Sequence, residues 1–150
     1  MPHELLKGRT AIITGAGQGL GRAIAREFAA EGAAVALIER NKDTLAETEQ
    51  EIVATHGTVL SYPLDITDYT AYGAAIEDAA ARWGHIDILV NNAAIVHYGT
   101  ILEDTLEHWR QQINVNLEAV YMGSKMVAPH MVKQNFGRII STASIQGFAS

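Results

Sequence analysis

The residues best suited to chemistry form a glycine-rich turn near the start of the chain. Segment 14–21 fits the spacing Thr-Gly-x-x-x-Gly-x-Gly, directly after a short apolar run. Glycines allow a sharp turn, let the backbone approach a diphosphate and let a helix pack tightly on a sheet. The first N–H groups of the helix that follows attract phosphates. The backbone positions predicted to hold a dinucleotide cofactor are Gly15, Gln18, Gly19, Leu20 and Gly21.

Two other phosphate-binding patterns do not fit this turn. Gly-x-Gly-x-x-Gly would require a glycine at Leu20 if it began at Gly15, or at Arg22 if it began at Gly17. The sequence contains no Gly-Lys pair, which a P-loop requires. An ordinary glycine-rich turn without a ligand is the remaining alternative. The strand before, the helix after and an acid at the end of the next strand favour nucleotide binding.

That acid is Glu39, 18 residues after Gly21 and directly after an apolar run. A carboxylate there can accept hydrogen bonds from the adenosine ribose hydroxyls, and it repels a 2′-phosphate. No Lys or Arg stands between Gly15 and Gly21 to attract that phosphate. These features favour NAD over NADP. Arg40 is the counter-evidence, because its side chain could accommodate the phosphate, and a solvated loop acid is the alternative for Glu39.

The elements that must position these residues alternate between strand and helix. Strands are expected at 10–14, 35–38, 59–62, 86–90 and 138–141, and helices at 20–31, 43–56, 69–83 and 106–131. The strands are apolar throughout, which is typical of a parallel sheet covered on both faces. We therefore predict one α/β domain over residues 1–150, a Rossmann-type doubly wound sheet with its ligand at the carboxyl ends of the strands. Two asparagines inside the last helix indicate a local irregularity or a polar role.

Composition limits the classes of partner. A net charge of −6 argues against nucleic acid, whose phosphates need a basic face. No apolar run approaches the length of a membrane span, and the first residues do not resemble a secretory signal. There are no cysteines, and the six histidines lack metal-ligand spacing. We expect a cytoplasmic protein with no metal, membrane or nucleic-acid partner.

Taken together, the motifs resemble those of the short-chain dehydrogenase/reductase family, in the right order along nearly all 150 residues. The segments 64–67 (Leu-Asp-Ile-Thr) and 91–94 (Asn-Asn-Ala-Ala) carry the likeness beside the glycine turn. The resemblance implies that Asp65 and Ile66 contact the adenine, and that Asn92 and Ala93 border the cofactor ribose. Asp65 could also be a helix cap or a turn residue. Ala94 departs from the family's usual glycine.

The resemblance also implies two catalytic residues. Asn116, followed by Leu, matches the active-site asparagine that holds a water linked to the catalytic lysine. Ser144 lies 28 residues later and matches the serine whose hydroxyl binds the substrate carbonyl oxygen. A Tyr-x-x-x-Lys is implied about a dozen residues after Ser144, beyond Ser150. We interpret the pair Tyr121 and Lys125, which has this spacing, as a chance match with Tyr121 used for packing.

The function implied by the resemblance is hydride transfer between NAD and a secondary alcohol or ketone, by a protein that is a tetramer when complete. The C-terminal strands and helices would be missing, so we expect the 150-residue chain to be inactive and marginally stable, with an uncovered fifth strand. His97, Tyr98 and Gln146 are interpreted as candidates for the substrate pocket.

Two alternatives stay open. One is an NAD-binding module without catalysis, and the other is a different Rossmann enzyme such as a methyltransferase. The asparagine pair, Asn116 and Ser144 argue against the second, because a methyltransferase needs none of them.

Overall fold

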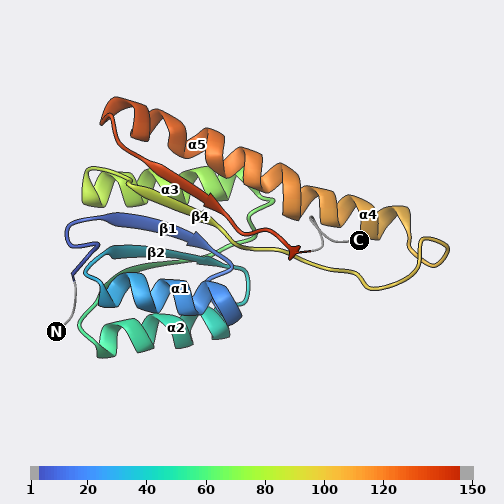
Figure 1. Cartoon of the computed structure of the whole chain (residues 1–150), viewed down its shortest axis with the longest axis horizontal. Helices are drawn as coiled ribbons and strands as arrows, with labels where there is room; N and C mark the ends of the chain where they lie inside the picture. The colour runs from blue at the N-terminus through green and yellow to red at the C-terminus, as the bar shows by residue number, and fades with distance from the viewer. Residues whose placement is uncertain (1–3, 146–150) are drawn as a thin grey trace.

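The computed structural model describes residues 4–145 as a parallel sheet with helices on both faces (Figure 1). The strands are β1 (Thr10–Thr14), β2 (Ala34–Glu39), β3 (Thr58–Pro63), β4 (Ile88–Asn91) and β5 (Arg138–Ser141). The helices are α1 (Gly19–Ala30), α2 (Lys42–Ala54), α3 (Tyr69–Trp83), α4 (Leu106–Ile113) and α5 (Ala119–Lys133), and a π-helical segment, η1 (Asn114–Glu118), joins the last two. The predicted α/β fold of the Rossmann type is confirmed.

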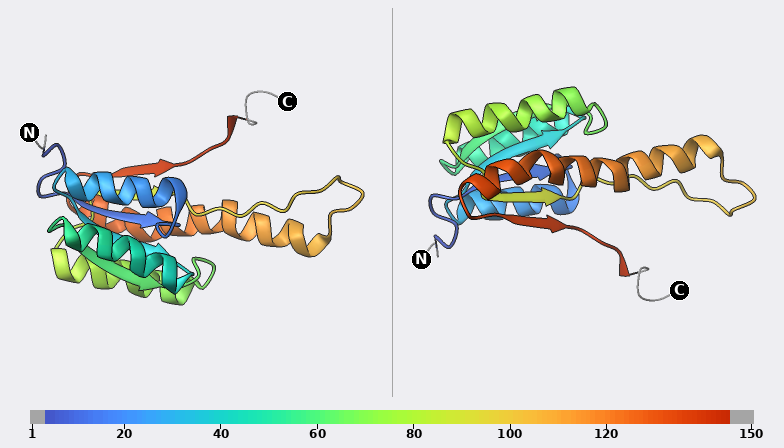
Figure 2. Two further views of the ribbon diagram at one scale, coloured as in Figure 1. Left: turned by 90° about the horizontal axis from the view of Figure 1, so that it is seen from below. Right: turned by 90° about the horizontal axis from the view of Figure 1, so that it is seen from above.

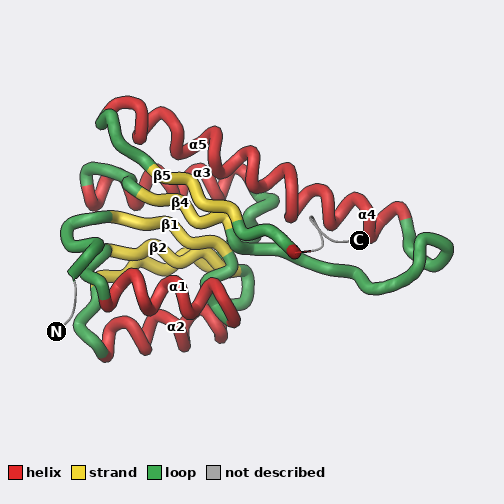
Figure 3. The backbone as a smooth tube through the Cα atoms, viewed as in Figure 1, coloured by secondary structure: helices red, strands yellow, loops and turns green. Residues whose placement is uncertain are grey.

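The strand order is β3-β2-β1-β4-β5, and every pairing is parallel (Figure 3). The chain builds outward from β1 to β3 and then returns to place β4 on the other side of β1. The order therefore reverses between β1 and β4. In open α/β sheets, ligands bind outside the carboxyl ends of the strands at such a reversal.

The core has two layers, one on each face of the sheet (Figure 2). On one face α1 and α2 cover alternate strand residues such as Ile13, Val35 and Leu37. On the other face α3 and α5 cover Ile12 and Leu89, among others. Both faces of each inner strand are thus buried, which is why these strands are apolar throughout instead of at every second residue.

The helix boundaries follow local signals. Gly32, just past the end of α1, has φ +90°, a conformation that glycine adopts without strain. Asn41 begins α2, since its side chain accepts the N–H of Asp43 at 3.0 Å. The predicted start of the fourth strand at residue 86 was wrong by two residues. There the carboxylate of Asp87 accepts the N–H of Thr10 at 3.0 Å, beside the first strand pairing.

The predicted long helix is three segments, because α4 and α5 are separated by the π-helical turn η1. The turn contains both Asn114 and Asn116, so the predicted irregularity is confirmed. Together with the loop that follows β4, α4 extends beyond the sheet as an arm (Figure 1). No helix within residues 4–145 is long and apolar enough to cross a membrane.

The outer strand β5 is exposed along its whole length. Ile139 is 44% exposed and Ile140 is 46% exposed, so this strand shows the apolar surface that the sequence indicated.

Candidate functional site

A crevice of about 270 Å³ opens at the carboxyl edge of the sheet. Seven of its lining residues are ones that the sequence predicted for the cofactor: Gly15, Gln18, Glu39, Asp65, Ile66, Asn92 and Ala93. The other lining residues are Ile38, Arg40, Leu64, Ala94, Ile95 and Val115. The predicted residues lie at or just after the carboxyl ends of four different strands, and the fold brings them to one edge.

The glycine turn has the geometry that its sequence predicts. Gly15 and Gly19 have φ of +66° and +52°, which favour glycine. A Cβ on Gly21 would overlap the carbonyl oxygen of Gly15 and would lie 2.6 Å from the amide nitrogen of Asn92. Gly19, Leu20 and Gly21 begin α1 beside the crevice and do not line it.

Helix α1 begins at this turn without a side-chain cap. Gln18 occupies the cap position and its side chain makes no capping hydrogen bond, and the first turn holds no acid. In the described part of the chain, the positive end of this helix is therefore not neutralised by its own first residues. Such an end suits an anion at the mouth of the crevice.

Thr14 and Asn92 join the ends of β1 and β4. The hydroxyl of Thr14 accepts the N–H groups of Asn92 at 3.0 Å and Ala93 at 3.1 Å. In return the Asn92 side chain donates to the carbonyl oxygens of Thr14 at 3.1 Å and Gly15 at 3.4 Å. The Asn92 amide thus braces the turn. Sequence reasoning included Thr14 in the motif but missed this role, which its place at the end of the first strand, directly before the turn, could have suggested.

Glu39 lies against the glycine turn. One of its carboxylate oxygens accepts the N–H of Asn41 at 3.0 Å, and the other faces the N–H of Gly17 at 3.4 Å. A Cβ on Gly17 would lie 2.6 Å from Cγ of Glu39 and 2.5 Å from Oγ1 of Thr44. A side chain at position 17 would force Glu39 or Thr44 to move, so the glycine there allows the acid to reach the turn.

Asp65 forms a turn, one of the two structural alternatives. Its Oδ1 accepts the N–H of Thr67 at 2.9 Å and the hydroxyl of Thr67 at 2.8 Å. The cap of α3 is Asp68, which accepts the N–H of Ala71 at 3.0 Å. Asp65 also lines the crevice, beside Leu64, an apolar residue of the same motif that was not among the predicted cofactor residues.

The π-helical turn holds the loop that follows β4. The Asn116 side chain accepts the N–H of Ile95 at 2.9 Å and donates to the carbonyl oxygen of Ile95 at 2.8 Å. Asn114 accepts the hydroxyl of Tyr69 at 2.8 Å, and burial raises the pKa of that hydroxyl. Both asparagines therefore have a polar role. Asn116 does not line the crevice, but Ile95, which it holds, does.

Ser144 lies three residues past the end of β5 and is exposed. The segment after β5 runs on a course away from α4 (Figure 2). Ser144 is not among the residues that line the crevice. Gln146, a candidate for the substrate pocket, lies outside the described residues.

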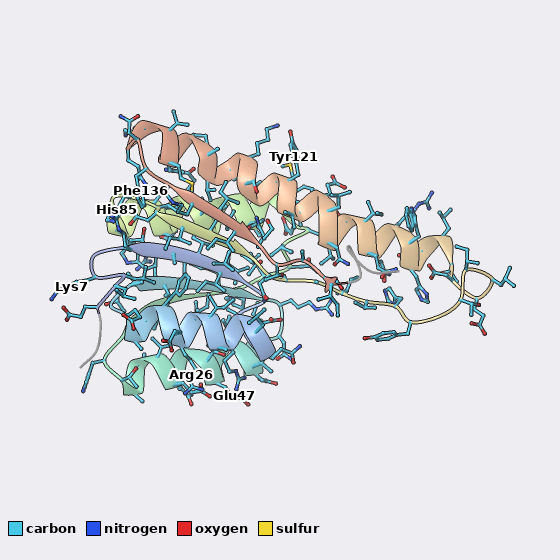
Figure 4. The ribbon with its side chains drawn as sticks, in the orientation of Figure 1. Lys7, Arg26, Glu47, His85, Tyr121 and Phe136 are labelled. Carbon is cyan, nitrogen blue, oxygen red and sulfur yellow. The ribbon has the colours of Figure 1, made fainter. Side chains whose placement is uncertain are left out.

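Neither Tyr121 nor Lys125 lines the crevice, and the Tyr121 side chain lies on the outer side of α5 (Figure 4). Tyr121 is 60% exposed, so its predicted packing role was wrong. The Nζ of Lys125 is 5.8 Å from the centre of the Tyr121 ring.

His97 and Tyr98 lie on the arm and do not line the crevice. The ring of His97 stacks on that of His108 at 4.1 Å, and Tyr98 is almost fully exposed. No group of three or more His, Cys, Asp or Glu side chains between residues 4 and 145 is arranged to hold a metal ion.

Comparison with known proteins gives consistent matches. Residues 9–150 match the family model for short chain dehydrogenases. The chain is 39% identical over 141 residues to 2-dehydro-3-deoxy-L-rhamnonate dehydrogenase (NAD(+)) of Sphingomonas sp. strain SKA58, covering 93% of this chain and 55% of the relative. The chain spans about half the length of the curated relatives it matches.

Two solved structures share the fold. An NAD+-bound xylitol dehydrogenase superposes with a TM-score of 0.92 at 28% identity, covering 97% of this chain and 56% of that one. A metagenomic short-chain oxidoreductase in complex with NADP gives 0.89 at 36% identity, covering 95% and 65%.

The family match extends over almost the whole chain, and it includes the glycine turn, the asparagine pair and the π-helical turn described above. It argues against the methyltransferase alternative. This chain belongs to the short-chain dehydrogenase family.

Proposed function

We propose that this chain is the cofactor-binding part of an NAD-dependent oxidoreductase that transfers hydride between nicotinamide and a secondary alcohol or ketone. One observation carries the proposal: the uncapped start of α1 and the carboxylate of Glu39 lie at the same crevice, at the reversal of strand order. An anion-binding helix end beside a hydroxyl-binding acid matches a dinucleotide.

The residues present fit such a cofactor. The diphosphate would lie on the backbone N–H groups at Gln18, Gly19 and Leu20, where glycines leave room for close approach. Glu39 would accept the hydroxyls of the adenosine ribose. The adenine would lie against Asp65 and Ile66. The bound nicotinamide supplies or accepts the hydride at its C4.

The nicotinamide end would meet the loop that follows β4. Asn92 and Ala93 would border the ribose there, held in place by the hydroxyl of Thr14. Asn116 would position the crevice wall through its two hydrogen bonds to Ile95.

In the whole protein, the Ser144 hydroxyl would donate to the substrate oxygen, and a tyrosine beyond residue 150 would exchange the proton with it. The cytoplasmic location and the tetramer stay predictions.

The choice of NAD depends on Glu39. The name of the Sphingomonas relative specifies NAD(+), and the xylitol dehydrogenase structure contains NAD+, which supports the choice. The metagenomic relative binds NADP, and Arg40 lines the crevice here, so the family alone does not decide. The carboxylate of Glu39 would repel a 2′-phosphate at the position where it would bind the free hydroxyls.

Titration with NADH and NADPH tests the proposal. We expect the Kd for NADPH to be higher than the Kd for NADH. Glu39→Ala should lower the ratio of these two Kd values about tenfold, since hydrogen bonds to a charged group contribute roughly 1.5–3 kcal/mol. Glu49→Ala, which removes an equal charge on α2 away from the crevice, should leave this ratio unchanged. Equal affinities in the parent chain would contradict the choice of NAD. Failure of the folded chain to bind either dinucleotide would overturn the proposed function.

A further inference from the structure

The side chain of Arg22 reaches from the first turn of α1 back to the glycine turn. Its Nε and Nη2 both donate to the carbonyl oxygen of Gly17, at 2.9 and 2.6 Å. The same Nη2 donates to a carboxylate oxygen of Glu47 at 2.7 Å, and Nη1 lies 3.5 Å from a carboxylate oxygen of Glu51. One guanidinium therefore connects the turn with α2.

These contacts determine how the peptide after Gly17 is oriented. The carbonyl oxygen of Gly17 and the N–H of Gln18 belong to one planar trans peptide and point in opposite directions. Because Arg22 holds the oxygen, the N–H is directed away from Arg22. Gln18 lines the crevice. The N–H of Gly17, in turn, faces Glu39 at 3.4 Å, so the peptides on both sides of Gly17 are held.

The charge of Arg22 is already compensated. The side chain is 23% exposed and has Glu47 and Glu51 beside it. Its effect on a bound anion should therefore come mainly from the geometry of the turn, since long-range attraction is balanced by these two carboxylates.

We propose that Arg22 is a positioning residue for the cofactor diphosphate, fixed in place by the two glutamates of α2. The inference rests on the proposed function, because it assumes that the diphosphate lies on this turn. It adds a residue that makes no contact of its own with the crevice, and it makes cofactor affinity depend on the α1–α2 contact.

Arg26 provides a matched control, four residues further along the same helix. Its Nε lies 3.3 Å from a carboxylate oxygen of Glu51, and its side chain is 62% exposed. In the described residues its ion pair is with Glu51 and not with the turn. Figure 4 shows Arg26 and Glu47 on the side of the sheet covered by α1 and α2. Replacing Arg26 removes the same charge beside Glu51, one of the two acids that Arg22 contacts, and leaves the Gly17 carbonyl untouched.

The experiment compares Arg22→Met, Arg22→Lys and Arg26→Met by two measurements. The first is the Kd for NADH, and the second is amide hydrogen exchange at Gly17 to Gly19 without cofactor. We expect Arg22→Met to raise the Kd about tenfold and to accelerate the exchange about tenfold, the effect of losing one charged hydrogen-bond donor. Arg26→Met should change either quantity less than twofold. Arg22→Lys should recover part of both, since an ammonium can still donate to the Gly17 oxygen.

Each outcome decides a different claim. Equal effects of Arg22→Met and Arg26→Met on the Kd would overturn the inference and leave the proposed function standing. Failure of the parent chain to bind NADH would overturn the proposed function. Independently of NADH binding, unchanged amide hydrogen exchange at Gly17 to Gly19 in Arg22→Met would overturn the inference. If Arg22→Met does not fold, Arg22→Lys is compared with Arg26→Lys. Equal NADH affinities of these two variants would overturn the inference.

Discussion

The contact between Asn116 and Ile95 can be tested by removing the amide in Asn116→Ala. The two hydrogen bonds join the π-helical turn to the backbone of the loop after β4. Each hydrogen bond contributes about 0.5–1.5 kcal/mol net. Because Asn116 is exposed, we take the lower part of this range, which gives about 1–2 kcal/mol for the pair. Local opening of the loop should then be roughly 5 to 30 times more frequent.

Amide hydrogen exchange at Ile95 reports directly on this contact, because its N–H is one of the two donors in it. Asn114→Ala is the matched control in the same turn. It loses the hydrogen bond to Tyr69 and keeps both bonds to Ile95. We expect faster exchange at Ile95 in Asn116→Ala and little change there in Asn114→Ala.

Two results would refute this reasoning. Unchanged exchange at Ile95 in Asn116→Ala would mean that the loop is held by other contacts. Equal acceleration in both variants would mean that any damage to the π-helical turn releases the loop, so the amide itself would have no special role.

Three further predictions concern stability, each measured by urea unfolding. Tyr72→Phe should raise the free energy of unfolding by about 1 kcal/mol, because the buried hydroxyl of Tyr72 has no hydrogen-bond partner within the described residues. Gly21→Ala should lower the free energy of unfolding by roughly 1–3 kcal/mol, because the new Cβ would overlap the glycine turn. Gly73→Ala is the control within a helix: its Cβ would meet its nearest neighbour at 3.7 Å, so this variant should raise the free energy of unfolding by about 1 kcal/mol. Asp78 accepts hydrogen bonds from the hydroxyl of Tyr62 and from the guanidinium of Arg82. These two bonds, that of Tyr62 most of all, lower the pKa of Asp78 below its ordinary value of 3.8. This stabilisation is present above that value and is lost as the pH falls through the lowered pKa, so Asp78→Asn should be less stable at neutral pH and match the parent chain in acid.

The sequence predicted most of the fold because its signals are local. The strands at 10–14 and 138–141 have the predicted bounds, since each apolar run is limited by polar or glycine residues. Helix 69–83 also has the predicted bounds, with Asp68 capping it and Gly84 at its end. The division of the last helix was only partly predictable. The two asparagines indicated an irregularity, but hydrophobic periodicity did not locate the extra residue of a π turn.

The site was predictable where a residue type has few structural uses. Glycines with positive φ and an acid after a strand have such restricted roles, so Gly15 and Glu39 could be selected. Apolar lining residues such as Ile95 resemble core residues, and only the strand order brings them to the crevice. The bond between Thr14 and Asn92 joins residues 78 apart in the sequence, which no local pattern indicates.

The π-helical turn also changes how the surface of the arm has to be interpreted. One residue in a helix corresponds to a rotation of about 100°, so the extra residue in η1 rotates α4 by that angle relative to a continuation of α5. A helical wheel drawn with a single period over 106–133 would therefore place Trp109 on the wrong face. Deleting one residue from the turn would bring both halves into phase and would carry Asn116 away from the backbone that it holds. The number of residues in η1 thus determines the direction in which the side chains of α4 point relative to those of α5.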